Sequence, residues 1–352
     1  MATWAKIERP IKDGTIVSMQ APQIVSASRS TDIPAFYADW FFKRLEKGYA
    51  AWTNPFNGVR SYISFAQTRF IVFWSKNPRP LLHYLPILKE RNISCYIQFT
   101  LNDYEAEGLE RGVPSLEERI STFQELASQI GKERVIWRFD PLLLTDDITV
   151  EKLLQKIEHI GDQLQGFTEK LVFSFADIAG YRKVKANLEA SHIPYHEFTE
   201  ETMRQFAEGL TKLNQRWNYT LATCGEKIDL APYGIQHNRC VDDELIGRIA
   251  YKDHELMKFL GLEVVSHFGK DFGSIVPENA IEISDTLYLR RTKDNKDKGQ
   301  RILCGCVASK DIGQYNTCPH LCEYCYANAS KQIAVQNWKR HKAQPFGESI
   351  IG

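Results

Sequence analysis

The sequence contains no apolar run that approaches the roughly 20 residues a helix needs to cross a membrane. Its first residues, MATWAKIERPIKDG, lack the apolar core of a secretory signal peptide. A net charge is also absent, because 44 Lys and Arg residues balance 44 Asp and Glu residues. No overall positive field therefore attracts a membrane or a nucleic-acid backbone, so neither partner is favoured. These absences predict a cytoplasmic protein in a compartment that keeps cysteines reduced.

In such a compartment the eight cysteines are expected to be free thiols or metal ligands, because structural disulfides are rare there. Five of the eight fall between positions 304 and 325. Core packing gives no reason for small hydrophobic side chains to crowd together in sequence, so the crowding indicates metal binding. Cys95 stands alone in an apolar run and is expected to be a packed core residue.

Short apolar runs alternate with amphipathic helical patterns about six times along the chain. The predicted strands cover residues 23–28, 70–74, 94–100, 134–139, 170–175 and 219–223. The predicted helices cover residues 34–48, 81–91, 115–130, 150–164, 200–217 and 243–260. Near-continuous apolar strands are typical of a parallel sheet covered by helices, and this number of repeats favours an α/β fold with a TIM-like or partial (βα) barrel. We expect residues 1–260 to form the barrel body and residues 261–352 to complete it.

Polar side chains follow the predicted strands, at the end where α/β folds carry their active sites. Arg138 lies within the apolar run VIWRF, and Asp140 comes two residues later. A buried guanidinium needs an anionic partner, and Arg138 suits the carboxylate of a ligand. The alternative is an ion pair within the protein, in which Asp140 binds either Arg138 or Arg29. Lys76 either holds the same ligand carboxylate or closes a loop, and Asp32 either serves the site or caps the next helix. The other candidates at strand ends are Ser28, Arg29, Asn77, Asn102, Asp103, Asp177 and Glu226, of which Asn102 and Asp103 also fit a turn.

The run CPHLCEYCYAN begins at Cys318 and has the spacing C-x3-C-x2-C. Three thiolates this close can hold three irons of a cubane cluster and leave the fourth iron open, as catalytic zinc sites keep one position open. The spacing differs from the C-x2-C-x2-C run of bacterial ferredoxins and from the paired C-x2-C of zinc sites. The alternative is a zinc site with His320 or an upstream cysteine as the fourth ligand.

This motif resembles the signature of the radical S-adenosylmethionine (SAM) superfamily, in which an aromatic residue precedes the last cysteine, as Tyr324 does here. The resemblance implies a [4Fe–4S] cluster on Cys318, Cys322 and Cys325 whose open iron binds the amino and carboxylate groups of SAM. It also implies a reductant such as ferredoxin or flavodoxin. One electron would cleave SAM to a 5′-deoxyadenosyl radical, which takes hydrogen from a small or macromolecular substrate that the sequence does not identify.

If the motif binds SAM, the polar residues at the strand ends are the candidates to contact SAM and the substrate, because of their position. The candidate SAM-binding residues are Ser28, Arg29, Asp32, Asn77 and Tyr324. The candidate catalytic residues are Lys76, Arg138 and Asp140. The GGE run that follows the second strand in that superfamily is missing, and SRSTD stands at the matching place.

The cluster motif lies near the C-terminus, whereas in most radical SAM enzymes it follows the first barrel strand. Two arrangements bring it to the barrel mouth. In a circularly permuted barrel, a strand over 301–307, the cluster loop over 309–326 and a helix over 327–341 precede the strand at 23–28. In the other arrangement, an added C-terminal tail folds over the mouth.

Most of the chain also resembles a bacterial family of unknown function, domain-of-unknown-function family 1848. The shared phrases are SASRSTDIPAFY, FWSKNP, WRFDP, TCGEKIDL and DIGQYNTCPHLCEYCYAN. This resemblance implies a radical SAM-like cluster and no particular reaction.

Four further cysteines are Cys224, Cys240, Cys304 and Cys306, enough thiols for an auxiliary [4Fe–4S] cluster or a zinc site. The alternative for Cys224 and Cys240 is that they are ordinary reduced cysteines. The sequence therefore predicts a radical SAM enzyme with a candidate second cluster. The alternative classes are a barrel stapled by zinc and an Fe–S protein that only transfers electrons.

Overall fold

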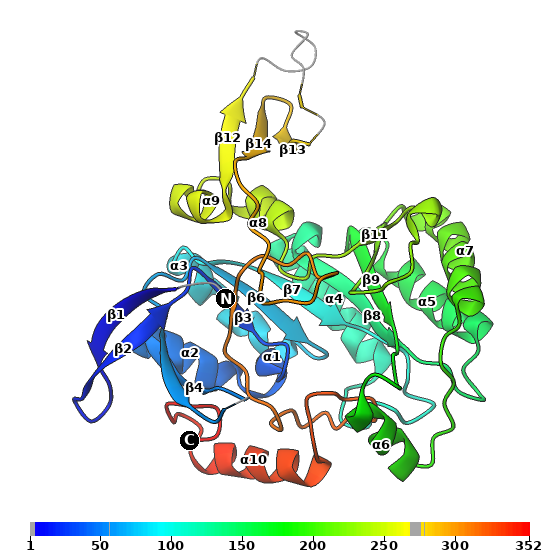
Figure 1. The fold of residues 1–352 in the computed structure, drawn as a ribbon, viewed down its shortest axis with the longest axis horizontal. Coiled ribbons are helices and arrows are strands. Elements are labelled where there is room, and N and C mark those ends of the chain that lie inside the picture. The colour runs from blue at the N-terminus through cyan, green and yellow to red at the C-terminus, as the bar shows by residue number, and fades with distance from the viewer. Residues whose placement is uncertain (1–3, 56, 268–275, 278) are drawn as a thin grey trace.

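The computed structural model describes residues 4–55, 57–267, 276–277 and 279–352. Within them, the main sheet has eight strands in the order β11-β10-β9-β8-β7-β6-β3-β15, and every neighbouring pair is parallel (Figure 1). In that order the strands are Ile235–His237, Thr220–Thr223, Lys170–Phe175, Val135–Leu142, Ser94–Thr100, Phe70–Ser75, Ile24–Ala27 and Lys310–Asp311. The α/β class and the six predicted strands are confirmed, and the sheet is consistent with a partial or open (βα) barrel.

The two faces of this sheet pack against different helices. Side chains alternate along each strand, so that Phe73 and Trp137 join one core cluster while Val72 and Ile136 join another. The first cluster is formed with α2 (Ala38–Lys47), α3 (Leu85–Glu90), α4 (Leu116–Ile130), α5 (Val150–Leu164), α6 (Arg182–Ala190) and α7 (Glu200–Trp217). The second is formed with α8 (Asp243–Ala250) and α9 (His254–Leu260). Both faces are therefore buried, which explains the near-continuous apolar strands.

The helices follow the predicted ranges, but three of them are interrupted. The range 34–48 divides at Tyr37 into α1 (Ile33–Phe36) and α2, and the range 81–91 begins as the 3₁₀ helix η1 (Arg79–Tyr84) before α3. The range 243–260 divides because Asp253 caps α9 with its side chain. The predicted cap of α4 is confirmed, since Ser115 and Glu118 form a capping box.

Two smaller sheets, one mixed and one antiparallel, were not predicted. One contains β1 (Ala5–Pro10), β2 (Ile16–Ala21), β5 (Arg60–Ser64) and β4 (Tyr49–Thr53), in which only β2 and β5 are parallel neighbours. The other contains β12 (Leu262–Ser266), β14 (Leu287–Arg291) and β13 (Ile281–Ser284), and it projects from the main body (Figure 1). Two short 3₁₀ helices, η2 (Lys132–Arg134) and η3 (Ala231–Tyr233), complete the set.

The C-terminal segment contributes a strand to the main sheet. The strand expected over 301–307 is wrong, because the pairing with β3 is made three residues later, by Lys310 and Asp311 of β15. Helix α10 (Lys331–Ala343) begins after Ser330, which caps it, and so starts four residues later than expected. Its Trp338 and His341 pack edge-on against Tyr37, with ring centroids 5.3 and 4.5 Å away.

No helix in the described part of the chain combines the length and apolar character needed to cross a bilayer.

Candidate functional site

The segment 312–330 joins β15 to α10 and carries Cys318, Cys322 and Cys325; we call it the cluster loop. Its first half is bonded to the segment that follows β3. Thr31 donates its hydroxyl to the carbonyl of Gln314 at 2.7 Å, and Tyr37 donates its hydroxyl to the carbonyl of Thr317 at 2.5 Å. Because strand carboxyl ends carry active sites in such folds, the loop lies where catalysis is expected.

Asp32 and His320 fasten the centre of the cluster loop. The Nε2 atom of His320 lies 2.8 Å from Asp32 Oδ2, and its Nδ1 atom lies 2.9 Å from the carbonyl oxygen of Gly112. Asp32 also accepts hydrogen bonds from Ser75 Oγ and the Lys76 amide, both at 2.7 Å. Burial works to raise the pKa of Asp32, but the contact with His320 outweighs it, and the pKa lies below its usual range. The Asp32 carboxylate is also the predicted cap, since it accepts the Ala35 amide at 3.0 Å.

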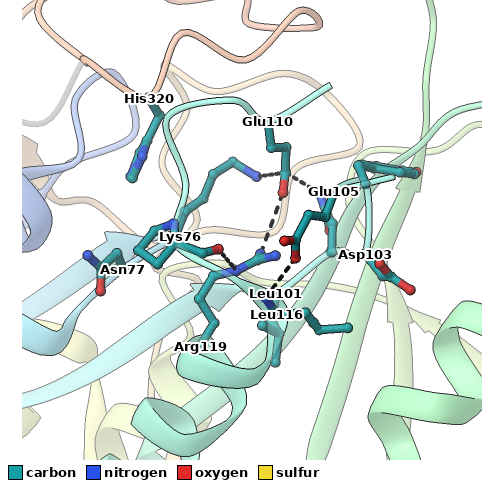
Figure 2. Close-up of polar contacts among 12 residues, drawn as sticks. Lys76, Asn77, Leu101, Asp103, Glu105, Glu110, Leu116, Arg119 and His320 are labelled. Carbon is teal, nitrogen blue, oxygen red and sulfur yellow. Dashed lines mark hydrogen bonds and ion pairs between the residues drawn. The ribbon is translucent and has the colours of Figure 1, made fainter. Parts of the chain in front are cut away.

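A buried network fixes Tyr324, the residue before the last cysteine of the motif. The Nζ atom of Lys76 donates to Glu110 Oε1 at 2.6 Å (Figure 2). It also donates to the Tyr324 hydroxyl at 2.9 Å. The amide of Asn102 donates to the same two groups, at 3.1 and 3.0 Å, and Tyr324 itself donates to Glu110. Arg119 supplies a second cation, 3.5 Å from Glu110 Oε2. The network therefore joins the cluster loop to β6, β7 and α4.

Glu110 remains ionised in this network although its side chain is only 2% exposed. Burial raises its pKa, but the charges of Lys76 and Arg119 outweigh that effect and lower the pKa to about 2. Neither Glu110 nor Arg119 was predicted. Glu110 lies in an irregular segment between β7 and α4, where no periodic pattern marks a position as buried.

The three cysteines of the motif are free thiols, of which Cys322 is buried and Cys318 and Cys325 are half-buried. Cys322 belongs to the main core cluster, Cys325 packs against it, and burial raises the pKa of all three thiols. In the described ranges no three Cys, His, Asp or Glu side chains are gathered around one point in the way that a single metal ion requires. A cubane cluster does not need such a point, because each cysteine binds a different iron. The donor set of three soft thiolates therefore fits an Fe–S cluster.

Ser28 packs directly beneath the cluster loop. A Cβ atom on Gly313 would come 1.7 Å from Ser28 Oγ, so the loop requires glycine at this position. Ser28 Oγ accepts the amide of Ser30 at 3.0 Å. This predicted SAM-binding hydroxyl thus contacts the loop and its own turn.

Arg29 differs from the other basic candidates in its surroundings. Its guanidinium lies over the ring of Trp74, 4.8 Å from the centroid, and its amide donates to Asp311 Oδ2 at 2.9 Å. No carboxylate of the described residues lies within ion-pair distance of this guanidinium, so the alternative pair with Asp140 is not formed. Burial opposes the charge of Arg29, but Cys306 and Asp311 nearby outweigh it, and the pKa stays above its usual value.

Arg138 forms the internal ion pair that the sequence left open as an alternative. Its Nε atom lies 3.2 Å from Asp140 Oδ2, and its Nη1 atom donates to Gln98 Oε1 at 3.2 Å and to Cys240 Sγ at 3.4 Å. Ser174 donates its hydroxyl to the other oxygen of Asp140. Arg138 is therefore fully engaged within the protein.

The remaining candidates take local roles. Asn77 lies apart from the Lys76–Glu110 pair (Figure 2), and its Oδ1 atom accepts the Arg79 amide at 3.4 Å. Asp103 pairs with Lys156 at 3.7 Å, and Asp177 accepts the Gly180 amide at 2.8 Å. Glu226 accepts the Phe175 amide at 3.0 Å, and burial raises its pKa to about 7.

The five cysteines outside the motif fall into two groups: Cys95 is a packed core residue, as predicted, and the other four lie in one region. Cys95 is packed in the main core cluster, and burial raises its pKa to about 12. Cys224 and Cys240 lie with their sulfurs 3.4 Å apart, on the opposite face of the sheet, where Cys304 and Cys306 also lie. The four thiols that the sequence grouped are thus brought into one region.

Comparison with known proteins identifies one related family. A family model described as "Domain of unknown function (DUF1848)" matches residues 24–327, from β3 to the end of the cluster motif. No curated protein and no solved structure matches the chain.

Proposed function

We propose that this chain, which belongs to the DUF1848 family, is a radical SAM-type Fe–S enzyme. One observation carries the proposal. The C-x3-C-x2-C motif lies on a loop that leaves the edge strand β15 and crosses the carboxyl ends of a parallel sheet. Three thiols with no fourth cysteine in the motif leave one metal position open for a small molecule.

The cluster, when bound, supplies one electron that cleaves SAM to a 5′-deoxyadenosyl radical able to take hydrogen from a substrate. In the proposal, Cys318, Cys322 and Cys325 hold the cluster. The Asp32–His320 pair and the Glu110–Tyr324 network hold the cluster loop rigid around them. Rigid support is what a reactive site requires, because small displacements of reacting groups reduce rates sharply.

Arg29 is the best candidate for the carboxylate of SAM. Its guanidinium has no carboxylate partner among the described residues, whereas Arg138 pairs with Asp140 and Lys76 with Glu110. A guanidinium recognises a carboxylate through two parallel hydrogen bonds. Lys76, Arg138 and Asp140 then serve as positioning residues at the strand ends, and Ser28, Asp32, Asn77 and Tyr324 stay as proposed contributors to the SAM site.

The order of the main sheet supports a circularly permuted barrel. Counted from β15, the units β15–α10, β3–α2, β6–α3, β7–α4, β8–α5 and β9 follow one another across the sheet. The cluster loop would then follow the first strand, as it does in the superfamily that the motif resembles. The proposal includes the division into a body at residues 1–260 and a completing segment at 261–352.

The proposed chemistry also requires an electron donor and a reducing location. Ferredoxin or flavodoxin is the proposed reductant, and the cytoplasm is the proposed compartment. All eight cysteines are free thiols, which agrees with such a compartment.

The test is SAM cleavage by the full chain. Protein reconstituted anaerobically with iron and sulfide should be brown, and dithionite with SAM should release 5′-deoxyadenosine. Cys322→Ala should abolish this release, whereas Cys95→Ala, on a thiol packed in the core, should retain it. A colourless protein that binds zinc at the motif and never cleaves SAM would contradict the proposal and favour a structural metal site.

A further inference from the structure

Three separate segments of the chain bring four cysteines into one region: Cys224, Cys240, Cys304 and Cys306. Cys224 follows β10, Cys240 precedes α8, and the other two flank Gly305 before β15. The segments are bonded to one another, since Val307 donates its amide to the carbonyl of Val241 at 3.0 Å. Folding therefore brings four thiols to the sheet face that opposes Cys95.

The sulfur atoms receive several hydrogen bonds. Cys306 Sγ accepts the amides of Cys240 and Val241 at 3.2 and 3.3 Å. Cys240 Sγ accepts Asn238 Nδ2 at 3.3 Å and Arg138 Nη1 at 3.4 Å. Donors that converge on sulfur stabilise thiolates, which is the arrangement that surrounds metal-bound cysteines.

Two further features distinguish this group from packed cysteines. Arg138, although paired with Asp140, also brings a buried positive charge within 3.4 Å of Cys240 Sγ. A Cβ atom on Gly305 would come 2.9 Å from Arg239 Cγ, so glycine lets the C-x-C turn approach the Cys240 segment closely. The cation fits a thiolate at Cys240, and the close approach brings Cys304 and Cys306 towards it.

A disulfide is a poorer explanation of the closest pair. The sulfurs of Cys224 and Cys240 are 3.4 Å apart, whereas a disulfide bond is about 2.05 Å long. Two thiolates bound tetrahedrally to one zinc, at about 2.3 Å each, lie roughly 3.8 Å apart. A disulfide between Cys224 and Cys240 would also not explain why Cys304 and Cys306 lie in the same region.

We propose that Cys224, Cys240, Cys304 and Cys306 form a second metal centre in which all four ligands are thiolates. Such a donor set selects zinc or an Fe–S cluster. The four sulfurs do not yet surround one point in the described residues, so a single zinc ion would have to draw them together, whereas each thiolate of a cubane cluster binds a different iron. With four protein ligands the centre has no open position, so it stabilises the fold or carries electrons and does not bind substrate. This inference is independent of SAM cleavage at the other three cysteines.

The experiment separates the two groups of cysteines. Cys318, Cys322 and Cys325 are changed together to Ser in the full chain, and iron, sulfide and zinc are measured after anaerobic purification and reconstitution with each metal. The folded variant should retain about one zinc or about four irons with sulfide per chain, the two results identifying the metal. The reciprocal variant, with Cys224, Cys240, Cys304 and Cys306 changed to Ser, should lose that metal, and Cys95→Ser should lose none.

A folded triple variant that binds neither zinc nor iron overturns the proposal, as does a reciprocal variant with the metal content of the wild type. Circular dichroism and gel filtration establish folding.

If either variant does not fold, metal analysis of the wild-type protein and of Cys304→Ser, at a half-buried position, tests the proposal instead. The wild type should then hold about eight irons, or about four irons and one zinc, and Cys304→Ser should lower that content. An unchanged metal content in Cys304→Ser overturns the proposal. Failure of SAM cleavage alone leaves these metal measurements unaffected.

Discussion

Glu110 is a buried carboxylate that links two cations to the cluster motif. Burying a charge costs free energy unless partners replace its hydration. Here Lys76 and Arg119 supply the opposite charge, while Tyr324 and Asn102 fill the remaining hydrogen-bonding positions. The orientation of Tyr324 therefore depends on charges that come from distant parts of the chain.

Replacing Glu110 by Gln should destabilise the protein by roughly 3–5 kcal/mol, because two cations would lose their buried partner. The free energy of unfolding in urea measures this. The matched control is Glu208→Gln, which breaks the exposed pair of Glu208 with Lys212 and should cost at most about 0.5 kcal/mol. Equal effects of the two substitutions would contradict the assigned role of Glu110.

The same carboxylate predicts a pH dependence of stability. Its pKa is about 2 in the folded protein and near the ordinary value of 4.5 in the unfolded chain. Because the folded pKa is the lower one, the contribution is complete above about pH 4.5 and is lost as the pH falls towards about 2. Urea unfolding between these pH values should show a steeper loss of stability in the wild type than in Glu110→Gln. Parallel curves would argue against an ionised Glu110.

The sequence identified some residues of the site, but not the long-range contacts that these residues make. Arg138 was visible because a charge interrupts an apolar strand, and its internal pair with Asp140 was one of the two alternatives considered. Asp32 was visible as a helix cap, but its contact with His320 joins residues that are 288 positions apart. Such contacts leave no local pattern.

The cluster loop is the element on which the proposed site depends. Gly313→Ala should displace it, because the added Cβ would meet Ser28 Oγ at 1.7 Å. We expect a loss of about 1–3 kcal/mol in stability, as for other overpacked sites, and a lower iron content after reconstitution. Thermal unfolding and iron analysis measure the two effects.

Gly299→Ala is the matched control for this substitution. Gly299 is exposed, and the nearest atom to an added Cβ is the flexible side-chain oxygen of Asp297 at 3.2 Å. This variant should resemble the wild type in both measurements. If Gly313→Ala also resembles the wild type, the close approach between the loop and β3 is not needed to hold the loop.

Among the elements, six of the eight parallel strands were predictable, whereas β11, β15 and the strands of the two smaller sheets were not. The six predicted strands are mostly buried and so appear as apolar runs. By contrast, β1 has exposed or half-buried residues throughout, and β15 has only two residues, so neither shows a recognisable pattern. At Tyr37, where the predicted helix divides, the side chain bonds to the cluster loop, a contact that no local pattern encodes.

At the scale of the whole molecule, the C-terminal segment is part of the core. Ile312, Tyr324 and Ile350 belong to the main core cluster, and the amide of Ala51 donates to the carbonyl of Glu348 at 2.8 Å. The segment therefore contributes to the main core cluster and, through β15, to the main sheet.

A chain that ends at Gln300 should consequently lose cooperative folding. It would expose the edge of β3 and the apolar surface that α10 and the cluster loop cover. We expect low soluble yield and a broad urea transition relative to the full chain, measured by circular dichroism. A soluble fragment with an unchanged, sharp transition would show instead that the C-terminal segment is a dispensable tail.

The sequence by itself determined the parallel α/β sheet and the three-cysteine motif, because both depend on patterns within short stretches: apolar runs and a fixed cysteine spacing. Only the tertiary structure decided where that motif is placed, which carboxylate holds Tyr324, and how Cys224, Cys240 and Cys306 come together. Those features depend on contacts between segments far apart in the chain. Such contacts follow from the packing of all the elements, which no local pattern encodes.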